Sequence, residues 1–372
     1  MTPRTFRLPN ELTDRVIDHL HDDRTSLNAC SVVCQDWRSA SQFQLFRHLS
    51  FTLKNPENLM YTMESFWKPP PDSVAHYLRH VQTLTLNNGR GHFTRLDLNC
   101  LGDLSKVLPN VRKLELSNTQ WASAANSTES KPPVPWMSIR TLKLSCTPIV
   151  VCPANALYVI LHMFPNIEHL EFNSVPCYKL SMLIDSNIAF PPVPKLRTLT
   201  CHDLSNIGNL FLGLKSMLGG QLDTVNIMMD HVDDGEKDFD FSEGTEPLPL
   251  QSLYLNRFTV LQHLNLIVRP GQFASQIPIL KQLPASIRTI TFELFWAPSD
   301  DSDIENCLED LEESEVLECI EPLSHLEVVR FMPMIKGVEM KPAARQLVRE
   351  RLPHLLERGL LQISHFHAPL KQ

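Results

Sequence analysis

The 372-residue sequence predicts an α/β protein, in which a short three-helix domain is followed by a curved solenoid of repeated units. Two observations predict this fold. A six-residue pattern of alternating apolar residues recurs nine times along the chain, and apolar residues with helical spacing occupy the first 50 positions. We expect a parallel β-sheet on the concave face of the solenoid, with helices outside it. The predicted domains are residues 1–50 (helical), 51–77 (connecting segment) and 78–372 (repeats).

The first 50 residues contain three helical patterns in succession. The first has Glu11 in its opening turn, where the helix dipole favours an acid, and its apolar face consists of Leu12, Val16, Ile17 and Leu20. The second consists of Leu27, Cys30, Val33, Cys34 and Trp37, and the third of Ala40, Phe43, Phe46 and Leu49. So small a domain leaves much apolar surface in water. Either the first repeat or a partner protein is expected to cover that surface.

The repeated pattern predicts the strands of the solenoid. Its copies begin at Val81, Val111, Ile139, Ile167, Leu196, Leu222, Leu261, Ile287 and Leu326. Six of the eight intervals between these starts are 26 to 30 residues long, and the other two are 39. Alternate residues such as Leu114 and Leu116 are apolar, which is typical of a strand with one buried face. Because one unit cannot bury its apolar face alone, the units must stack into a continuous parallel sheet.

These units resemble irregular leucine-rich repeats over residues 78–335, with a degenerate last copy near 359–366. The resemblance is incomplete, because the asparagine that normally follows the strand is approximated only by Asn118. Comparable positions elsewhere are occupied by Thr147, Val175 and Met229.

Acidic residues are concentrated in two segments. The net charge is −8, but residues 230–246 hold eight acids and residues 299–321 hold eleven. Each segment lies within one of the two 39-residue intervals, so we expect two insertions that loop out of the repeat. Such charge runs are either solvated loops or docking sites for a basic partner.

The N-terminal pattern resembles the F-box over residues 6–49. The resemblance rests on Leu-Pro-x-Glu-Leu at 8–12, the apolar residues Ile17 and Leu20, Val-Cys-x-x-Trp at 33–37, and Leu-Phe-x-x-Leu at 45–49. In that family the F-box docks on the Skp adaptor of an SCF cullin-RING ubiquitin ligase. A downstream domain, commonly of leucine-rich repeats, holds the client, which is the protein to be ubiquitinated.

The resemblance implies a residue set for each surface. Trp37 would anchor the second and third helices beside the adaptor contacts, which are Leu8, Pro9, Glu11, Leu12, Ile17, Leu20, Leu27 and Val33. Residues between the buried leucines line the concave face, and the candidates for binding the client there are Lys113, Glu115, Lys143, His169, Glu171, His263, Asn265 and Arg330. This face is also rich in threonine, which fits the β-propensity of any exposed strand.

We therefore expect a non-catalytic substrate-recognition subunit of an SCF-type E3 ubiquitin ligase, with a Skp-type adaptor, cullin and RING subunits and an unknown client as partners. The alternative is a leucine-rich-repeat scaffold that acts outside ubiquitination. A site assembled across repeats is a more distant alternative, because spacing alone does not exclude an enzyme.

Other classes of function have little support in the sequence. There is no glycine-rich phosphate loop, Gly-x-Ser-x-Gly or His-Glu-x-x-His motif, so we expect neither enzyme activity nor a cofactor. The nine cysteines include no Cys-x-x-Cys pair, which argues against a zinc site or disulfide framework and favours an intracellular protein, in the cytoplasm or nucleus. No apolar run approaches the ~20 residues of a membrane span, and dispersed basic residues argue against nucleic-acid binding.

Overall fold

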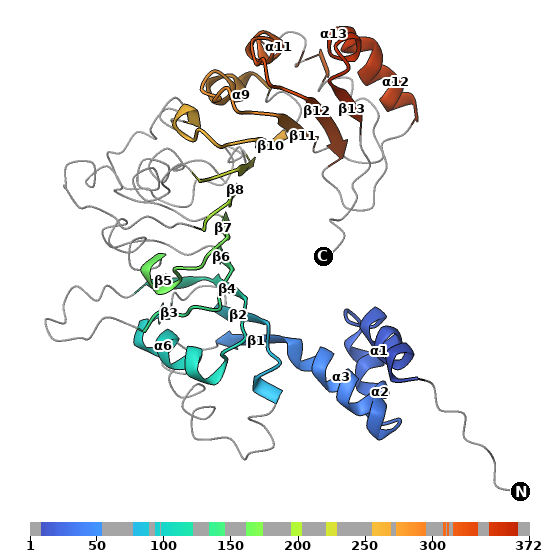
Figure 1. The fold of residues 1–372 in the computed structure, drawn as a ribbon, viewed down its shortest axis with the longest axis vertical. Helices are drawn as coiled ribbons and strands as arrows, with labels where there is room; N and C mark the ends of the chain where they lie inside the picture. Colours follow the sequence, from blue (N-terminus) through green and yellow to red (C-terminus); the bar gives the residue numbers. More distant parts are fainter. Residues whose placement is uncertain are drawn as a thin grey trace, which may run out of the picture. The chain divides into compact units, whose positions relative to one another are not determined.

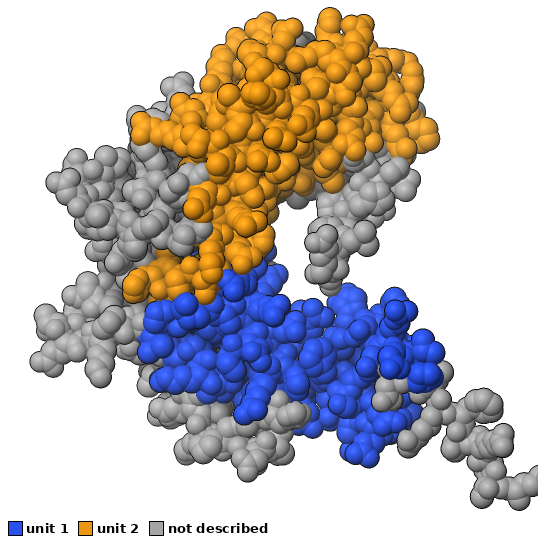
Figure 2. All heavy atoms as spheres, viewed as in Figure 1, with its two compact units in different colours: residues 1–147 blue, residues 148–372 orange. Residues whose placement is uncertain are grey.

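The computed structural model describes fourteen stretches of the chain: residues 9–53, 77–88, 94–96, 98–121, 134–145, 161–173, 195–202, 221–228, 255–268, 273–294, 308–309, 311, 315–333 and 342–363. The chain divides into two compact units, Met1–Thr147 and Pro148–Gln372 (Figure 2). Both units combine helices with parallel strands (Figure 1).

Three helices form the N-terminal part of the first unit, and we call this part the head. They are α1 (Asn10–His19), α2 (Arg24–Cys30) and α3 (Gln35–Arg47). Its core consists of Ile17, Leu27 and Cys30, and the residues packed around that core are Leu20, Trp37, Ala40 and Leu45. Asp23 caps α2, because its carboxylate accepts a hydrogen bond of 3.0 Å from the backbone N–H of Ser26. The presence of three helices agrees with the sequence, whereas their identification as an F-box stays a prediction.

The predicted limits of the second and third helices are wrong. α2 ends at Cys30, and Cys34 has extended backbone angles (φ −157°, ψ 172°) as the residue before α3. Val33 and Cys34 are therefore exposed in the connection between the helices, and Trp37 belongs to α3. The apolar spacing continues from one helix into the next across this short connection, so periodicity alone did not show the break.

The strands of the first unit are parallel and lie in the order β1, β2, β4, β6. Their bounds are His48–Leu53, Thr83–Asn88, Lys113–Ser117 and Thr141–Ser145. Helix α6 (Leu98–Val107) precedes β4, and a separate pair consists of β3 (Thr94–Leu96) and β5 (Thr119–Trp121). Strand β1 corrects two predictions, because Leu49 is not helical and residues 51–53 are not part of a connecting segment. Its sequence HLSFTL has the same alternation as HLNLIV in a later repeat.

The head packs on the start of this sheet through α3. Phe46 stacks on Tyr77 with ring centroids 4.9 Å apart, and Phe43 meets His80 edge-on at 5.2 Å. The Tyr77 hydroxyl also donates a hydrogen bond of 3.0 Å to Gln42 Oε1. Tyr77 and His80 of the first repeat thus pack on Phe46 and Phe43 of α3.

In its described residues, the second unit contains seven parallel strands in chain order. They are β7 (His169–Asn173), β8 (Thr198–His202), β9 (Thr224–Met228), β10 (His263–Val268), β11 (Thr289–Leu294), β12 (Val328–Pro333) and β13 (Leu361–Ile363). The helical segments are η4 (Leu255–Arg257), α9 (Phe273–Leu280), α11 (Val316–Ile320), α12 (Pro342–Arg351) and α13 (Pro353–Glu357). The predicted last copy near 359–366 corresponds to β13, which pairs with β12.

Alternate burial confirms the repeated parallel strands. In β4 and β6 to β9, the second and fourth residues are buried while the first, third and fifth face outward. Helices α9, α11 and α13 lie on one side of the neighbouring strands (Figure 1), and Phe273 of α9 contacts Phe292 of β11. Helices therefore cover the buried face, and the polar face stays open, as expected of a leucine-rich-repeat-like solenoid.

The two acidic segments have different outcomes. Residues 230–246 lie outside the described residues. In the second segment Leu308, Leu311, Val316 and Ile320 are buried, and residues 316–320 form α11. The expectation that the whole second segment loops out is therefore wrong, because its apolar residues pack into the core between the acids. Thr147, Val175 and Met229 also lie outside the described residues, whereas Asn118 has a positive φ of 54° directly after β4.

Candidate functional site

The head exposes apolar side chains that its own core does not use. Pro9, directly before α1, is exposed, and the exposed fractions of Leu12 and Val16 are 47% and 44%. Residues spaced by three and four positions share one face of a helix. We call Pro9, Leu12 and Val16 the α1 apolar strip. Exposed apolar side chains that share one helix face are candidates for contact with a partner.

Val32 and Val33 are exposed in the connection between α2 and α3. Both border an open groove of about 1270 Å³, whose lining also includes the carboxylates of Asp14, Asp18 and Asp36. The groove continues to Tyr77 and His80, so it lies where the head meets the first repeat. The head therefore has an apolar strip on one side of α1 and, on another, a groove lined by acids together with Arg38.

The structure separates the predicted adaptor contacts into accessible and inaccessible residues. Pro9, Glu11, Leu12 and Val33 are exposed, whereas Leu8 lies outside the described residues. Ile17 and Leu27 are buried in the core of the head, so the direct contact predicted for them does not fit this structure. Leu20 and Trp37 are half-buried against the same core. Trp37 packs within the head, whereas adaptor binding by the accessible residues stays a prediction.

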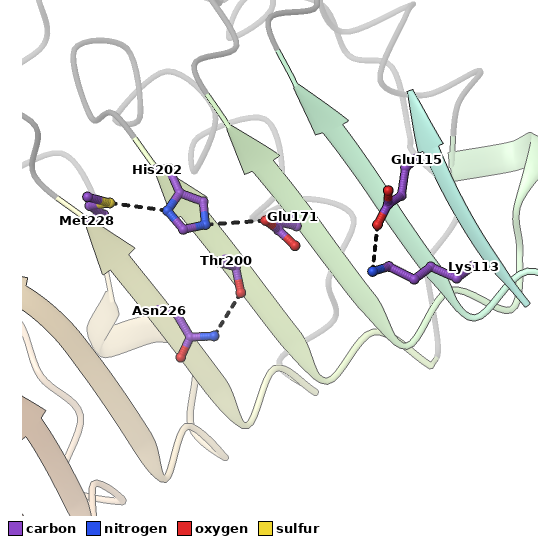
Figure 3. Close-up of polar contacts among 7 residues, drawn as sticks. All are labelled: Lys113, Glu115, Glu171, Thr200, His202, Asn226 and Met228. Atoms are coloured by element: carbon purple, nitrogen blue, oxygen red, sulfur yellow. Dashed lines mark hydrogen bonds and ion pairs between the residues drawn. The ribbon is translucent and has the colours of Figure 1, made fainter. Parts of the chain in front are cut away.

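In the first unit, outward side chains of β2, β4 and β6 form a charged cluster, of which Figure 3 shows Lys113 and Glu115 on β4. Lys113 Nζ lies 2.6 Å from Glu115 Oε1, and the Thr85 hydroxyl donates a hydrogen bond of 3.0 Å to Glu115 Oε2. Burial raises the pKa of Glu115, but the hydrogen bonds from Lys113 and Thr85 and the charges of Lys113 and Lys143 outweigh burial. The pKa of Glu115 therefore lies below its usual value, and the carboxylate is ionised at neutral pH.

In the second unit, His202 links two neighbouring strands (Figure 3). Its Nε2 lies 3.3 Å from Glu171 Oε1 on β7, and its Nδ1 lies 3.3 Å from Met228 Sδ on β9. Glu171 and His202 are both half-buried, with side chains about a quarter exposed: 24% and 25%. The imidazole therefore contacts side chains of both neighbouring strands on the open face.

Amide side chains continue the polar row across the second unit. Asn226 donates a hydrogen bond of 2.7 Å to the Thr200 hydroxyl (Figure 3), and Asn265 donates one of 2.6 Å to Asn226 Oδ1. Further along, Arg330 Nη2 donates a hydrogen bond of 3.0 Å to Gln362 Oε1. These cross-strand bonds leave the row ordered before any partner arrives.

All eight predicted client candidates lie on strands, at positions that alternate with buried residues. Lys113, His169 and His263 are the first residues of their strands, and the others lie two residues after such a start. Sequence reasoning missed His202, Met228, Glu293 and Gln362. For His202, Met228 and Glu293 the signal was present, because the same alternation continues one step beyond the six-residue pattern.

Glu293 differs from the other acids on this face. Its neighbours in register are Ile267 on β10 and Met332 on β12, both apolar. Burial raises the pKa of Glu293, and the charge of His202 opposes only part of that shift. The carboxylate is thus partly desolvated between apolar neighbours, and a cation placed beside it would offset that cost.

Within the described stretches, no group of three or more His, Cys, Asp or Glu side chains is arranged to hold a metal ion. Over the same part of the chain, no helix has both the length and the apolar character needed to cross a membrane.

No protein-family model matches the chain, and a search of curated proteins finds no significant match. Among solved structures, a protein from Bacteroides fragilis is similar, with 11% identity, a TM-score of 0.40, and coverage of 85% of this chain and 73% of that one. The complex of TLR13 with ssRNA13 is similar with 12% identity, a TM-score of 0.30, and coverage of 81% of this chain and 42% of that chain. These similarities are too low to assign a family.

Proposed function

We propose that this protein is a non-catalytic substrate-recognition subunit of an SCF-type E3 ubiquitin ligase. The head docks on a Skp-type adaptor, and the open face of the strands holds a client protein. The observation that carries the proposal is the α1 apolar strip, which is exposed on a head whose core is already formed by Ile17, Leu27 and Cys30. The F-box resemblance of the same residues supports this reading of the strip.

The backbone before α1 suits a docking role. Pro9 has φ −53° and ψ 142° and occupies the cap position of the helix without a side-chain cap. A proline has little backbone freedom to lose, so an apolar knob at this position can be presented at low entropic cost. Because α3 is already covered by Tyr77 and His80, the first repeat does not need the α1 strip for its own packing.

The open face of the strands supports the second part of the proposal, which is that this face holds a client protein. Its polar side chains are ordered by bonds such as Lys113–Glu115 and Asn226–Thr200, so a bound protein would meet a fixed pattern of donors and acceptors. Holding a client near the ligase raises its effective concentration, and the subunit needs no reacting group of its own. A repeat face of this kind serves protein interaction in the scaffold alternative as well.

The test is a pull-down of the full chain with a purified Skp-type adaptor. Leu12→Asp places a charge in the apolar strip, and we expect it to lower adaptor binding at least about tenfold. Leu356→Asp is the matched control, because Leu356 is 48% exposed on α13 and Leu12 is 47% exposed on α1. Adaptor binding that is absent in the wild type, or equal in both variants, would contradict the proposal.

Two additions sharpen the same experiment. A Leu8→Ala, Pro9→Ala double variant tests the Leu-Pro knob and should lose adaptor binding while the repeats stay folded. Ubiquitination of a bound client, measured with the assembled ligase, separates a ligase subunit from a scaffold that binds the adaptor without client turnover.

A further inference from the structure

Five outward side chains form a continuous row near the carboxyl ends of strands β8 to β12. In strand order they are His202, Met228, Ile267, Glu293 and Met332, and each lies in register with the next. We call this row the Met228 surface. With strands about 4.8 Å apart, it spans about 19 Å, the length of about six residues of extended peptide.

The Met228 surface is more apolar than the rest of the open face. Met228, Ile267 and Met332 are partly exposed, although they occupy positions that carry polar groups in the first unit, such as Ser117 and Ser145. Met side chains adapt their shape to different partners and are common at binding surfaces. An apolar floor with a carboxylate inside it is thus confined to this part of the second unit's strands.

Two acidic side chains lie in or beside that floor, and one of them pairs with His202. Glu293 lies between Ile267 and Met332, and Glu171 lies beside His202 at the other end. The chain also runs from Met228 directly into residues 230–246, which hold eight acids and one lysine. The second acidic segment begins at residue 299, five residues after β11 ends. Strands β9 and β11 end at the edge where the Met228 surface lies, and the chain continues from each of them into one of the acidic segments.

We infer that the Met228 surface binds a client segment in which a lysine or arginine neighbours apolar residues. The long aliphatic part of the basic side chain packs on Met228 and Ile267, while its charged end reaches the Glu293 carboxylate. The neighbouring apolar residues of the client contact Met332. This inference rests on the proposed use of the open face to hold a protein, and it adds the chemistry of that protein.

A bound cation would offset the cost of the partly desolvated Glu293 carboxylate. The ionised Glu293 is destabilised by its apolar neighbours, and an incoming ammonium or guanidinium group relieves that cost where water is partly excluded. The net negative charge of the chain favours the same partner, because electrostatic steering raises association rates for opposite charges. An acidic or purely apolar partner would leave the Glu293 carboxylate desolvated and uncompensated.

The experiment selects a random 12-residue peptide library, displayed on phage, against the immobilised full-length protein. We expect the selected peptides to be enriched in Lys or Arg next to apolar residues. A synthetic peptide with the consensus sequence should then bind Glu293→Gln at least about fivefold more weakly than wild type. Glu327→Gln is the matched control, because it removes the same charge at the opposite end of the strands, where Glu327 pairs with Arg288. Its affinity should change less than twofold.

A second variant protects the test against misfolding. Met228→Lys replaces a partly exposed side chain with one whose positive charge repels the basic residue of the peptide. It should remove peptide binding while the melting temperature stays close to that of the wild type. The inference fails if no peptide is selected, if selected peptides lack basic residues, or if Glu293→Gln binds as tightly as the wild type. Adaptor binding is measured separately through the head, so a protein that binds the adaptor but no basic peptide contradicts this inference alone.

Discussion

Two half-buried glutamates on the open face show how neighbours decide the charge state of a residue. Glu115 has Lys113 and Thr85 as direct partners and Lys143 nearby, so the pKa of Glu115 falls below the usual 4.5 despite burial. Glu293 lies between Ile267 and Met332, and burial raises the pKa of Glu293 above 4.5. The ionised carboxylate therefore stabilises the fold at one position and opposes it at the other.

This difference predicts opposite effects of the same substitution. At pH 7, Glu115→Gln should lower the melting temperature and Glu293→Gln should raise it. Because both sites are partly solvated, each change in the free energy of unfolding should be at most about 1 kcal/mol. The stability from Glu115 is present above pH 4.5 and is lost as the pH falls through its lowered pKa. The penalty from Glu293 is absent below pH 4.5 and grows as the pH rises through its raised pKa. Thermal melts between pH 3 and 8 test this, and shifts of the same sign at pH 7 would contradict it.

The burial of a residue could be predicted from the sequence where apolar and polar residues alternate along a strand. Leu114, Leu142 and Leu170 are buried as the six-residue pattern requires. In α1, however, the predicted apolar face divides, because Ile17 is fully buried while Leu12 and Val16 stay exposed. Helical spacing shows only that these residues share a broad face, and the position of α3 decides which part of that face is covered.

At the level of elements, a column of three phenylalanines joins helix and strands in the second unit. The Phe292 ring on β11 lies 5.4 Å from Phe273 of α9 and 5.2 Å from Phe331 of β12, measured between ring centroids. All three side chains are fully buried. The column therefore fixes the helix layer to the sheet behind the Met228 surface.

Truncation within this column should destabilise the second unit strongly. Phe292→Ala removes contacts to both neighbours and leaves a cavity, so we expect a loss of about 3–5 kcal/mol in unfolding free energy. Leu356→Ala, on the exposed surface, should change it by less than about 0.5 kcal/mol. Urea denaturation followed by circular dichroism measures both. A loss below about 1 kcal/mol for Phe292→Ala would mean that the column does not support the sheet.

Elements were predictable where the repeat is regular and were missed at its ends. Nine strands follow from the nine copies, but β1 was missed because its alternation, HLSFTL, directly continues the helical apolar spacing of α3. Similarly, α11 was hidden inside an acidic segment, because charge counts do not show that Val316 and Ile320 fall on one buried face. A short apolar pattern does not distinguish a helix from a strand until the flanking residues are considered.

At the level of the whole molecule, the distribution of charge decides which partners are attracted. The net charge of −8 includes nineteen acids in the two segments 230–246 and 299–321, so the rest of the chain is mildly basic. A chain with this net negative charge attracts a basic client and repels acidic ones. Long-range attraction of this kind acts mainly on the association rate and is weakened by salt.

Neutralising the first acidic segment should therefore slow client binding without weakening the fold. Replacing Asp233, Asp234, Glu236, Asp238, Asp240 and Glu243 by their amides changes the net charge from −8 to −8 + 6 = −2. Since none of the contacts in the Met228 surface is altered, the dissociation rate of the basic consensus peptide should stay unchanged. Its association rate should fall several-fold at about 0.05 M salt, and the difference should disappear near 1 M salt, where the Debye length is only about 3 Å. Stopped-flow fluorescence with labelled peptide measures both rates.

Equal association rates at low salt would show that the segment does not steer the client. A large drop in melting temperature would show that the segment is packed against the repeats rather than looped out.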